Sequence, residues 1–370
     1  MKKTRYDERH TLFSRIRLVK GTKEYSEFYT AHPHYQQKDD AIRQPEFHLN
    51  TRQDASFKTR VFPMTEALNP LLKSLHKTVE THPVSDNKIT VGDAFSNTIK
   101  ALTKLYGAHD VGIIKLKEDH YYTHKGFTGA MIGLSHYGET ITPNYTHAVV
   151  FLIPMNFDYL KRSPHYETML ASLTTYHQVA QVGAQLAMYI KSIGYQAAFM
   201  SDQYYLAPMV PLAYDAGLGQ IGMSNHLVHP VYGNAIRLGA VFTTLKLKPD
   251  APIDFGLDAF CKRCALCLMN CPMQSIKPQK RIVNQRPFYR FDDQSCYEMF
   301  VNIGTDCGIC LQSCPYSTQI DLKTQEAMRN DPEKIDQFLK SYLSKTGPKR
   351  RFSNKNPLLI TKGGTDGNNA

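Results

Sequence analysis

The sequence predicts an α/β (α+β) body that is followed by a small cysteine-rich domain. Helical and strand-like patterns alternate between residues 91 and 245, which is typical of layered folds of helices and strands. All eight cysteines lie between Cys261 and Cys314. With 370 residues, of which 42% are hydrophobic, the chain can bury a sizeable core, so global disorder is excluded.

Two helices of the body are expected from their periodicity. From Val91 to Tyr106 the apolar residues recur at spacings of three and four, as on an amphipathic helix, and Gly107 would end it. Glu167–Ile193 is a longer helical run that is broken at Gly194.

Strands are expected where short apolar runs occur. Asp110–Leu116 and His147–Pro154 have the composition of buried strands. Further along, Val210–Asp215 and Leu238–Leu245 bracket a glycine-dense turn, AGLGQIG, at 216–222.

Around this body the chain is expected to divide into four parts. The first residues are polar, with scattered aromatics and few periodic runs, and the last ones combine basic residues with glycine and asparagine. The expected parts are an N-terminal arm (1–60), the body (61–250), the cysteine-rich domain (251–325) and a C-terminal helix with a flexible tail (326–370).

The formal net charge of +11 allows several explanations. Part of it lies in the tail, and an acidic partner protein or an anionic cofactor would account for the rest. Nucleic-acid binding is the alternative, but no basic helix with interleaved aromatics occurs. The start has no apolar run behind its basic residues, and no run of about 18 apolar residues occurs, so a cytoplasmic protein without a membrane span is expected.

The cysteine spacing carries the most specific chemistry. The first run is Cys-x2-Cys-x2-Cys-x3-Cys-Pro from Cys261 to Pro272, the pattern of bacterial ferredoxins, in which the fourth cysteine ligates a different cluster from the first three. The second run, Cys307-x2-Cys310-x3-Cys314-Pro, lacks one upstream ligand, which Cys296 can supply. A disulfide framework would spread the cysteines along the chain.

This spacing predicts two 4Fe–4S clusters. One would be held by Cys261, Cys264, Cys267 and Cys314, and the other by Cys271, Cys296, Cys307 and Cys310. Two zinc sites are the alternative, because CxxC pairs also form tetrahedral sulfur sites.

The glycine turn fits G-x-G-x-x-G at Gly217, Gly219 and Gly222, but it lacks the βαβ context of a dinucleotide site. Its glycines are expected to let the backbone approach something flat and bulky.

Several segments together resemble the corrinoid-dependent reductive dehalogenases and the related epoxyqueuosine reductases. They are the cysteine blocks FCKRCALCLMNCPMQSI and DDQSCYEMFVNIGTDCGICLQSCPYS, the block around AGLGQIGMSNHLVHP, and the shorter DERHTLFSR, YGAHDVGIIKL, YYTHKG and YIKSIGYQA. The resemblance runs from about residue 5 to about residue 320. It is closer to the dehalogenases, whose pattern the CYEMF and CGIC segments follow.

The resemblance implies a nitroreductase-like domain that binds cobalamin base-off, capped by a two-cluster ferredoxin-like domain. Electrons would pass through both clusters to the cobalt, and a small organohalide would lose its halide. No reductase domain is found in the sequence, so an external ferredoxin or flavodoxin would supply the electrons. Cofactor-binding positions implied by the resemblance are Ser172, Gly217, Gly219, Gly222 and His226.

The same resemblance implies the catalytic residues. Tyr176 fits the proton-donating tyrosine, four residues after Ser172 on one helix face, and Arg237 fits its basic partner. An arginine within reach would lower the pKa of a tyrosine. From chemistry alone, Tyr176 could be a core tyrosine and Arg237 a member of a surface ion pair.

Asp202 is a second candidate for the proton donor. It lies near the position where the epoxyqueuosine reductases have an acidic donor, and an apolar pocket can raise a carboxyl pKa enough for that role. It could also be a helix cap or turn residue. One alternative function is therefore that of an epoxyqueuosine reductase, which acts on tRNA. A second alternative, from a different class of protein, is an electron carrier without catalytic activity.

Overall fold

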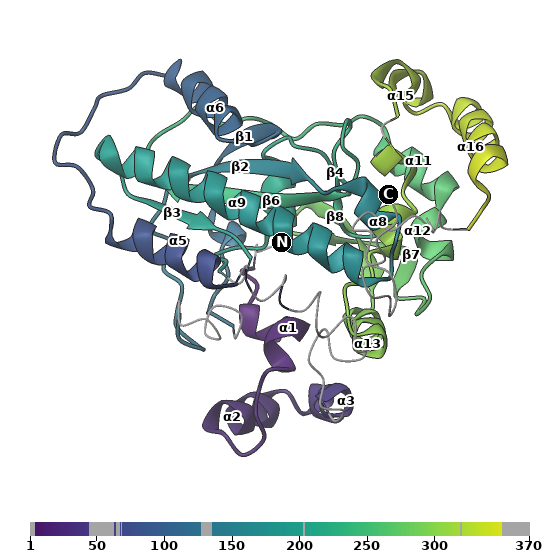
Figure 1. Ribbon diagram of the computed structural model, residues 1–370, viewed down its shortest axis with the longest axis horizontal. Helices are drawn as coiled ribbons and strands as arrows, with labels where there is room; N and C mark the ends of the chain where they lie inside the picture. The colour runs from purple at the N-terminus through teal and green to yellow at the C-terminus, as the bar shows by residue number, and fades with distance from the viewer. Residues whose placement is uncertain are drawn as a thin grey trace, which may run out of the picture.

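A four-stranded antiparallel sheet forms the centre of the molecule in the computed structural model (Figure 1). The structure describes residues 4–43, 63, 67, 69–126, 135–202, 204–318 and 320–349. The strand order is β1-β2-β6-β3, with bounds β1 (Asp110–Lys115), β2 (His147–Pro154), β3 (Ala197–Met200) and β6 (Ile236–Thr243). Both strands predicted before residue 155 are present, and β2 has the predicted bounds.

Helices cover one face of the sheet. The long helix α9 (Tyr166–Ser192) lies across it, with α5 (Asn69–Thr81) and α6 (Phe95–Leu105) beside it (Figure 1). Because side chains alternate along a strand, Val149 and Phe151 of β2 point into this layer. The neighbouring Val150 packs in the cluster on the opposite face.

The opposite face is covered by shorter elements. They are α10 (Met209–Asp215) and the two-residue strands β4 (Gln220–Ile221) and β5 (Leu227–Val228). Leu212 and Ala213 of α10 are fully buried there. Burial on both faces explains why β2 is an uninterrupted apolar run instead of an alternating one.

The N-terminal segment is more regular than expected. It contains a short 3-10 helix (η1, Glu8–His10) and three helices, α1 (Leu12–Arg15), α2 (Lys23–Ala31) and α3 (Pro33–Arg43). Aromatic residues of α2 pack on each other, and Leu12 and Ile42 pack against α13 (Asp293–Ile303). The predicted N-terminal arm therefore contains regular helices within 8–43, and residues 44–60 lie outside the described part.

The cysteine-rich region is built from short helices and one hairpin, at the right of Figure 1. Its elements are α11 (Leu257–Cys264), α12 (Leu266–Met269), β7 (Ile276–Val283), β8 (Arg286–Phe291), α13, α14 (Ile309–Gln312) and the 3-10 helix η4 (Pro315–Thr318). Helices α15 (Leu322–Met328) and α16 (Pro332–Thr346) follow and pack on α11. Residues 350–370, which include most of the predicted tail, lie outside the described residues.

Buried polar contacts join this region to the sheet. Arg286 of β8 forms salt bridges with Asp215 at 2.6 Å and Asp119 at 3.1 Å, and all three side chains are largely buried. The Asp215 carboxylate also contacts the His120 ring at 2.8 Å. His120 therefore has the role of a polar contact.

Candidate active site and cysteine sites

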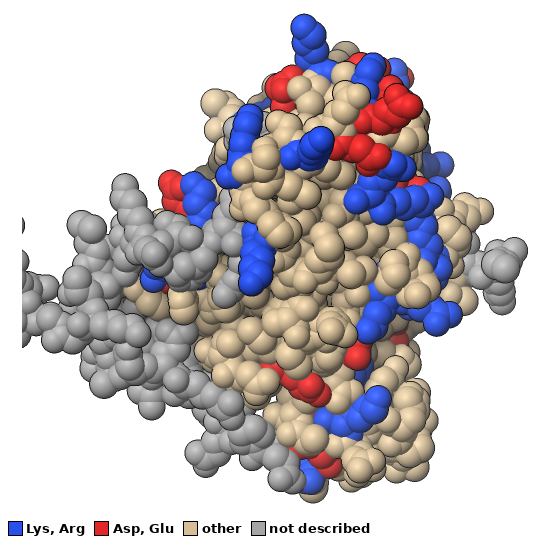
Figure 2. Space-filling view, turned by 90° about the vertical axis from the view of Figure 1, so that its right-hand side faces the viewer, with Lys and Arg blue, Asp and Glu red and all other residues tan. Residues whose placement is uncertain are grey.

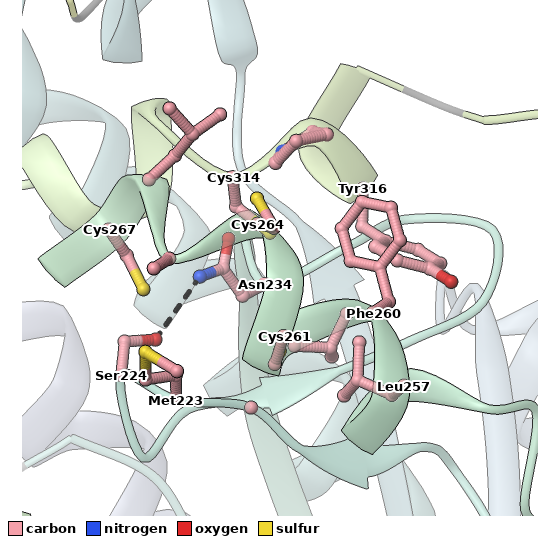
Figure 3. A pocket seen from close by; sticks show the side chains of 15 residues that line it. Met223, Ser224, Asn234, Leu257, Phe260, Cys261, Cys264, Cys267, Cys314 and Tyr316 are labelled. Carbon is pink, nitrogen blue, oxygen red and sulfur yellow. Dashed lines mark hydrogen bonds between the residues drawn. The ribbon is translucent and has the colours of Figure 1, made fainter. Parts of the chain in front are cut away.

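One set of four cysteines surrounds a small apolar cavity (Figure 3). Cys261 and Cys264 lie on α11, Cys267 on α12, and Cys314 just before η4. Ala265 joins the two helices in the left-handed region, with φ 45°, a conformation that costs an alanine about 1–2 kcal/mol. This turn restarts the helix at a new angle, so that Cys267 faces the same cavity as the other three.

The remaining four cysteines form a second set. Cys310 is within electrostatic reach of Cys271, Cys296 and Cys307. The backbone N–H of Ser275 donates to Cys271 Sγ at 3.3 Å. The structure therefore brings the cysteines together in the two groups that the spacing predicts.

The donor set of each group fits a 4Fe–4S cluster. Burial raises the pKa of the Cys264 thiol to about 12 and, in the second set, that of Cys296 to about 12. Cluster binding would release these protons, because the thiolate is the ligand. Within the described residues, no three His, Cys, Asp or Glu side chains converge on a position for a single metal ion.

A polar group lies at the start of β6, where this strand meets α9. Arg237 of β6 donates from Nη2 to Ser172 Oγ at 2.6 Å, and its guanidinium carbon lies 4.8 Å from the centre of the Tyr176 ring. Ser172 and Tyr176 are one helical turn apart on α9. The structure thus brings these three predicted residues together.

The environment of Tyr176 keeps it protonated. Burial raises its pKa to about 12, although Arg237 and a hydrogen bond with Tyr205 act in the opposite direction. The predicted lowering by Arg237 is therefore present, but burial outweighs it. Asp202 and Asp306 contribute further to the raised pKa.

Asp202 lies beside this group, on the short segment between β3 and α10. It is half-buried and raises the pKa values of both Tyr176 and Tyr205. The same carboxylate is within electrostatic reach of Arg17. Burial lowers the pKa of this arginine. Both candidate proton donors therefore lie in one site.

His226 is held by its own loop. Its Nδ1 and the Ser224 hydroxyl are 3.1 Å apart. Burial, together with the nearby Arg237, lowers the pKa of His226 to about 4. The ring is therefore neutral at physiological pH and lies near the positive charge of Arg237.

The glycine turn has a different explanation from the expected one. A Cβ on Gly217 would lie 2.4 Å from the Ala251 carbonyl oxygen, and a Cβ on Gly219 would lie 2.2 Å from that of Val228. A Cβ on Gly222 would meet the Val228 side chain at 2.8 Å. These glycines permit close packing of the chain on itself, so the expected approach to a flat partner is not needed to account for them.

Sequence reasoning named Arg237 but did not single out Arg17 or Asp306. Arg17 has a buried Nη1, and Arg237 a buried Nε, for which the described residues offer no hydrogen-bond partner. Asp306 precedes Cys307 and acts on Tyr176 through its charge. Its place beside the CGIC segment was a usable signal, whereas nothing local marks Arg17.

Five aromatic residues of the body have different surroundings. Tyr205 bonds to Tyr176, while Tyr204 packs against His76 and beneath the Lys125 ammonium. Tyr121 is a core residue with 1% exposure. Tyr122 packs against the core on the α10 face of the sheet, and Phe157 packs against a cluster that includes Ala171 of α9.

The two cysteine sets are those of an iron–sulfur domain. Residues 260–318 match the family model described as a 4Fe-4S dicluster domain. The chain is a homologue of the reductive dehalogenases, with the epoxyqueuosine reductases as further relatives. Relatives of the first kind are oxidoreductases.

Two curated relatives illustrate this relationship. The chain is 26% identical over 252 residues to the tetrachloroethene reductive dehalogenase of Sulfurospirillum multivorans, covering 60% of this chain and 50% of the relative. It is 29% identical over 152 residues to the epoxyqueuosine reductase of Lactococcus garvieae, covering 40% and 42% of the two chains. The matched part of the chain covers half or less of the length of these curated relatives.

Among solved structures, the catabolic reductive dehalogenase NpRdhA matches with a TM-score of 0.74 at 20% identity, over 95% of this chain and 47% of that chain. This match supports the α/β fold with its C-terminal dicluster domain. No helix within the described residues has the length and apolar character needed to cross a membrane.

Proposed function

We propose that the chain is a cobalamin- and iron–sulfur-dependent reductase that removes halide from a small organohalide. The observation that carries the proposal is the buried pair of Tyr176 and Arg237 close to one of the two cysteine sets. Replacing the halogen by hydrogen consumes two electrons and one proton and releases a halide ion. The chain must therefore deliver both electrons and a proton to one place.

Tyr176 is the proposed source of the proton. With a pKa of about 12, its hydroxyl keeps the proton at neutral pH and gives it up only to a strongly basic carbon centre. The phenolate that forms is stabilised by the Arg237 guanidinium and by the Tyr205 hydroxyl. Ser172 accepts a hydrogen bond from Arg237 and so holds the guanidinium over the ring.

The second cysteine set is the proposed point from which electrons reach this site. Its loop packs against α9, since a Cβ on Gly308 would lie 2.5 Å from Thr168 Cγ2. Asp306 of the same loop acts on Tyr176. The set of Cys261, Cys264, Cys267 and Cys314 packs instead towards α11 and α16, and would receive the electrons first.

Cobalamin is proposed from the relatives and fits the residues in part. One structural neighbour is described as suggesting a mechanism for B12-dependent dehalogenation. A bound corrinoid would supply a strongly reducing cobalt centre. The buried Nε–H of Arg237, which lacks a partner among the described residues, and the neutral His226 are the groups available to it. The predicted glycines are already used in chain packing.

Asp202 supports a second candidate function. Its position beside Tyr176 and Tyr205 would suit a carboxylic acid that donates the proton, as expected for an epoxyqueuosine-reductase-like enzyme that acts on tRNA. The two proposals differ in substrate and in the acid that they require.

Anaerobic reconstitution with iron, sulfide and cobalamin tests the proposal. We expect about eight irons and one cobalt per chain, and bromide release from a brominated phenol with dithionite as reductant. Tyr176→Phe should strongly lower bromide release, whereas Asp202→Asn should retain it. Iron binding without cobalt binding would contradict the reductase. Activity on epoxyqueuosine tRNA that is lost in Asp202→Asn would favour the second candidate.

A further inference from the structure

The β7–β8 hairpin concentrates positive charge next to the cysteines. Residues 276–291 contain five basic side chains and no acidic one. All seven residues of β7 that follow Ile276 are exposed. The basic residues are Lys277, Lys280, Arg281, Arg286 and Arg290.

Two of these charges are neutralised within the molecule. Arg286 is buried in its salt bridges with Asp215 and Asp119, and Lys280 pairs with Asp258. For Lys277, Arg281 and Arg290, the described residues provide no salt-bridge partner. Three guanidinium or ammonium groups therefore remain available to a partner on the outer side of the hairpin.

Two large apolar side chains near the hairpin are also exposed. Ile282 of β7 is 70% exposed, and Met269 at the end of α12 is 59% exposed. Helix α12 packs against β7. Figure 2 shows this side of the molecule, where lysines and arginines gather along one edge of an area without charged side chains. An apolar area with a charged rim is the composition of a protein-docking surface.

The base of the hairpin contacts both cysteine sets. Ile276 and Tyr289 pack in one cluster, against which Cys261, Cys267, Cys271 and Cys310 also lie. The Ser275 N–H that precedes β7 donates to Cys271 Sγ. A partner bound on this surface would therefore come close to the cysteine sulfurs, and short distance is the main requirement for a site of electron entry.

We propose that the outer face of the β7–β8 hairpin, together with the end of α12, is the docking surface for an acidic ferredoxin. In each encounter the ferredoxin is oxidised by one electron and the dicluster domain is reduced by one, so two encounters supply the pair that a dehalogenation consumes. The inference rests on the redox role within the proposed function. Electrostatic steering suits such partners, because electron-transfer complexes are small and short-lived.

Charge and position favour a ferredoxin over RNA. A bound tRNA would need basic side chains around Tyr176 and Arg237, where its modified base must enter. Lys277, Arg281 and Arg290 lie instead on the hairpin, whose base contacts the cysteines. An acidic protein surface complements three closely spaced cations, and it needs no sequence-reading contacts.

The test uses the reconstituted protein and an acidic bacterial ferredoxin as donor. The triple variant Lys277→Glu, Arg281→Glu, Arg290→Glu is compared with Lys38→Glu, Lys73→Glu, Lys77→Glu. The control has the same change in net charge, on exposed residues of α3 and α5. Stopped-flow absorbance follows cluster reduction at low and high salt. The hairpin variant should be reduced about tenfold more slowly at low salt, with a weaker salt dependence, while dithionite should reduce both variants equally fast.

Equal rates with ferredoxin in the two triple variants would overturn the proposal. So would a hairpin variant that is reduced more slowly by dithionite as well, since the substitutions would then act on the clusters. Loss of tRNA affinity without a change in ferredoxin kinetics would assign the surface to RNA instead. Cluster reduction requires no organohalide, so a charge-dependent rate without bromide release would keep this inference and reject the proposed function.

Discussion

Arg237 contacts both Ser172 and Tyr176, and it holds a positive charge 4.8 Å from the centre of the tyrosine ring. The contact connects the central strand β6 with the long helix α9. Neither residue is near the other in sequence, and the pair exists only because α9 crosses the sheet over β6. The charge is placed where it stabilises a phenolate more than a neutral phenol.

Tyr176→Phe removes the hydroxyl and keeps the ring under Arg237. We expect bromide release to fall by about 10²–10⁴-fold, the usual contribution of a positioned acid, with iron content unchanged. Because the pKa of Tyr176 is raised to about 12, the wild-type rate should show no loss from tyrosine ionisation between pH 6 and pH 9. Tyr189→Phe, on the same helix, is the control. A similar loss in both variants would point to a disturbed helix.

Spacing indicated the cysteine sets because each motif is local, with three thiols within seven residues at 261–267 and three within eight at 307–314. It also predicted β2, whose apolar run is long and uninterrupted. The antiparallel order β1-β2-β6-β3 could not be predicted, because β6 pairs with β2 across more than eighty residues. The helices of 8–43 were missed because α2 and α3 carry mainly polar residues, and their few aromatics pack on each other.

The approach of Arg17 to Asp202 could not be predicted from the sequence either, since the two residues belong to distant segments.

Glycine patterns show where a side chain is absent, but they do not identify the group that needs the space. For Gly219 that group is the Val228 carbonyl. The sequence could therefore locate the candidate site more reliably than it could assign roles within it.

His76 should make stability depend on pH. Burial, aided by the charge of Lys125, lowers its pKa from 6.5 to about 3, and the ring stacks on Phe199 and bonds to Ser201. Below pH 6.5 the unfolded chain takes up a proton that the folded chain refuses, so the free energy of unfolding falls as the pH drops towards about 3. His76→Gln should flatten this part of the profile, measured by urea unfolding. His82→Gln serves as the control, and an equal flattening there would contradict the assignment.

Arg286 should be essential for attaching the hairpin to the body. Arg286→Met leaves Asp215 and Asp119 buried without their cation, and breaking a buried pair in this way costs about 3–5 kcal/mol. Arg290→Met on the same strand removes an exposed arginine and should change stability by less than about 0.5 kcal/mol. Chemical unfolding of the cofactor-free chain measures both. Similar stabilities of the two variants would show that the buried network does not hold the hairpin.

Gly219→Ala separates the two explanations of the glycine turn. The added Cβ would lie 2.2 Å from the Val228 carbonyl oxygen, so β4 and β5 must separate and the cofactor-free chain should lose about 1–3 kcal/mol of stability. Gly92→Ala, where a Cβ meets nothing within 4 Å, should be neutral or slightly stabilising. Thermal unfolding before and after cobalamin addition distinguishes the cases. The opposite result would be a Gly219→Ala variant that has the wild-type unfolding temperature without cobalamin but is no longer stabilised when cobalamin is added. The glycine would then contact the cofactor, and the packing explanation would be wrong.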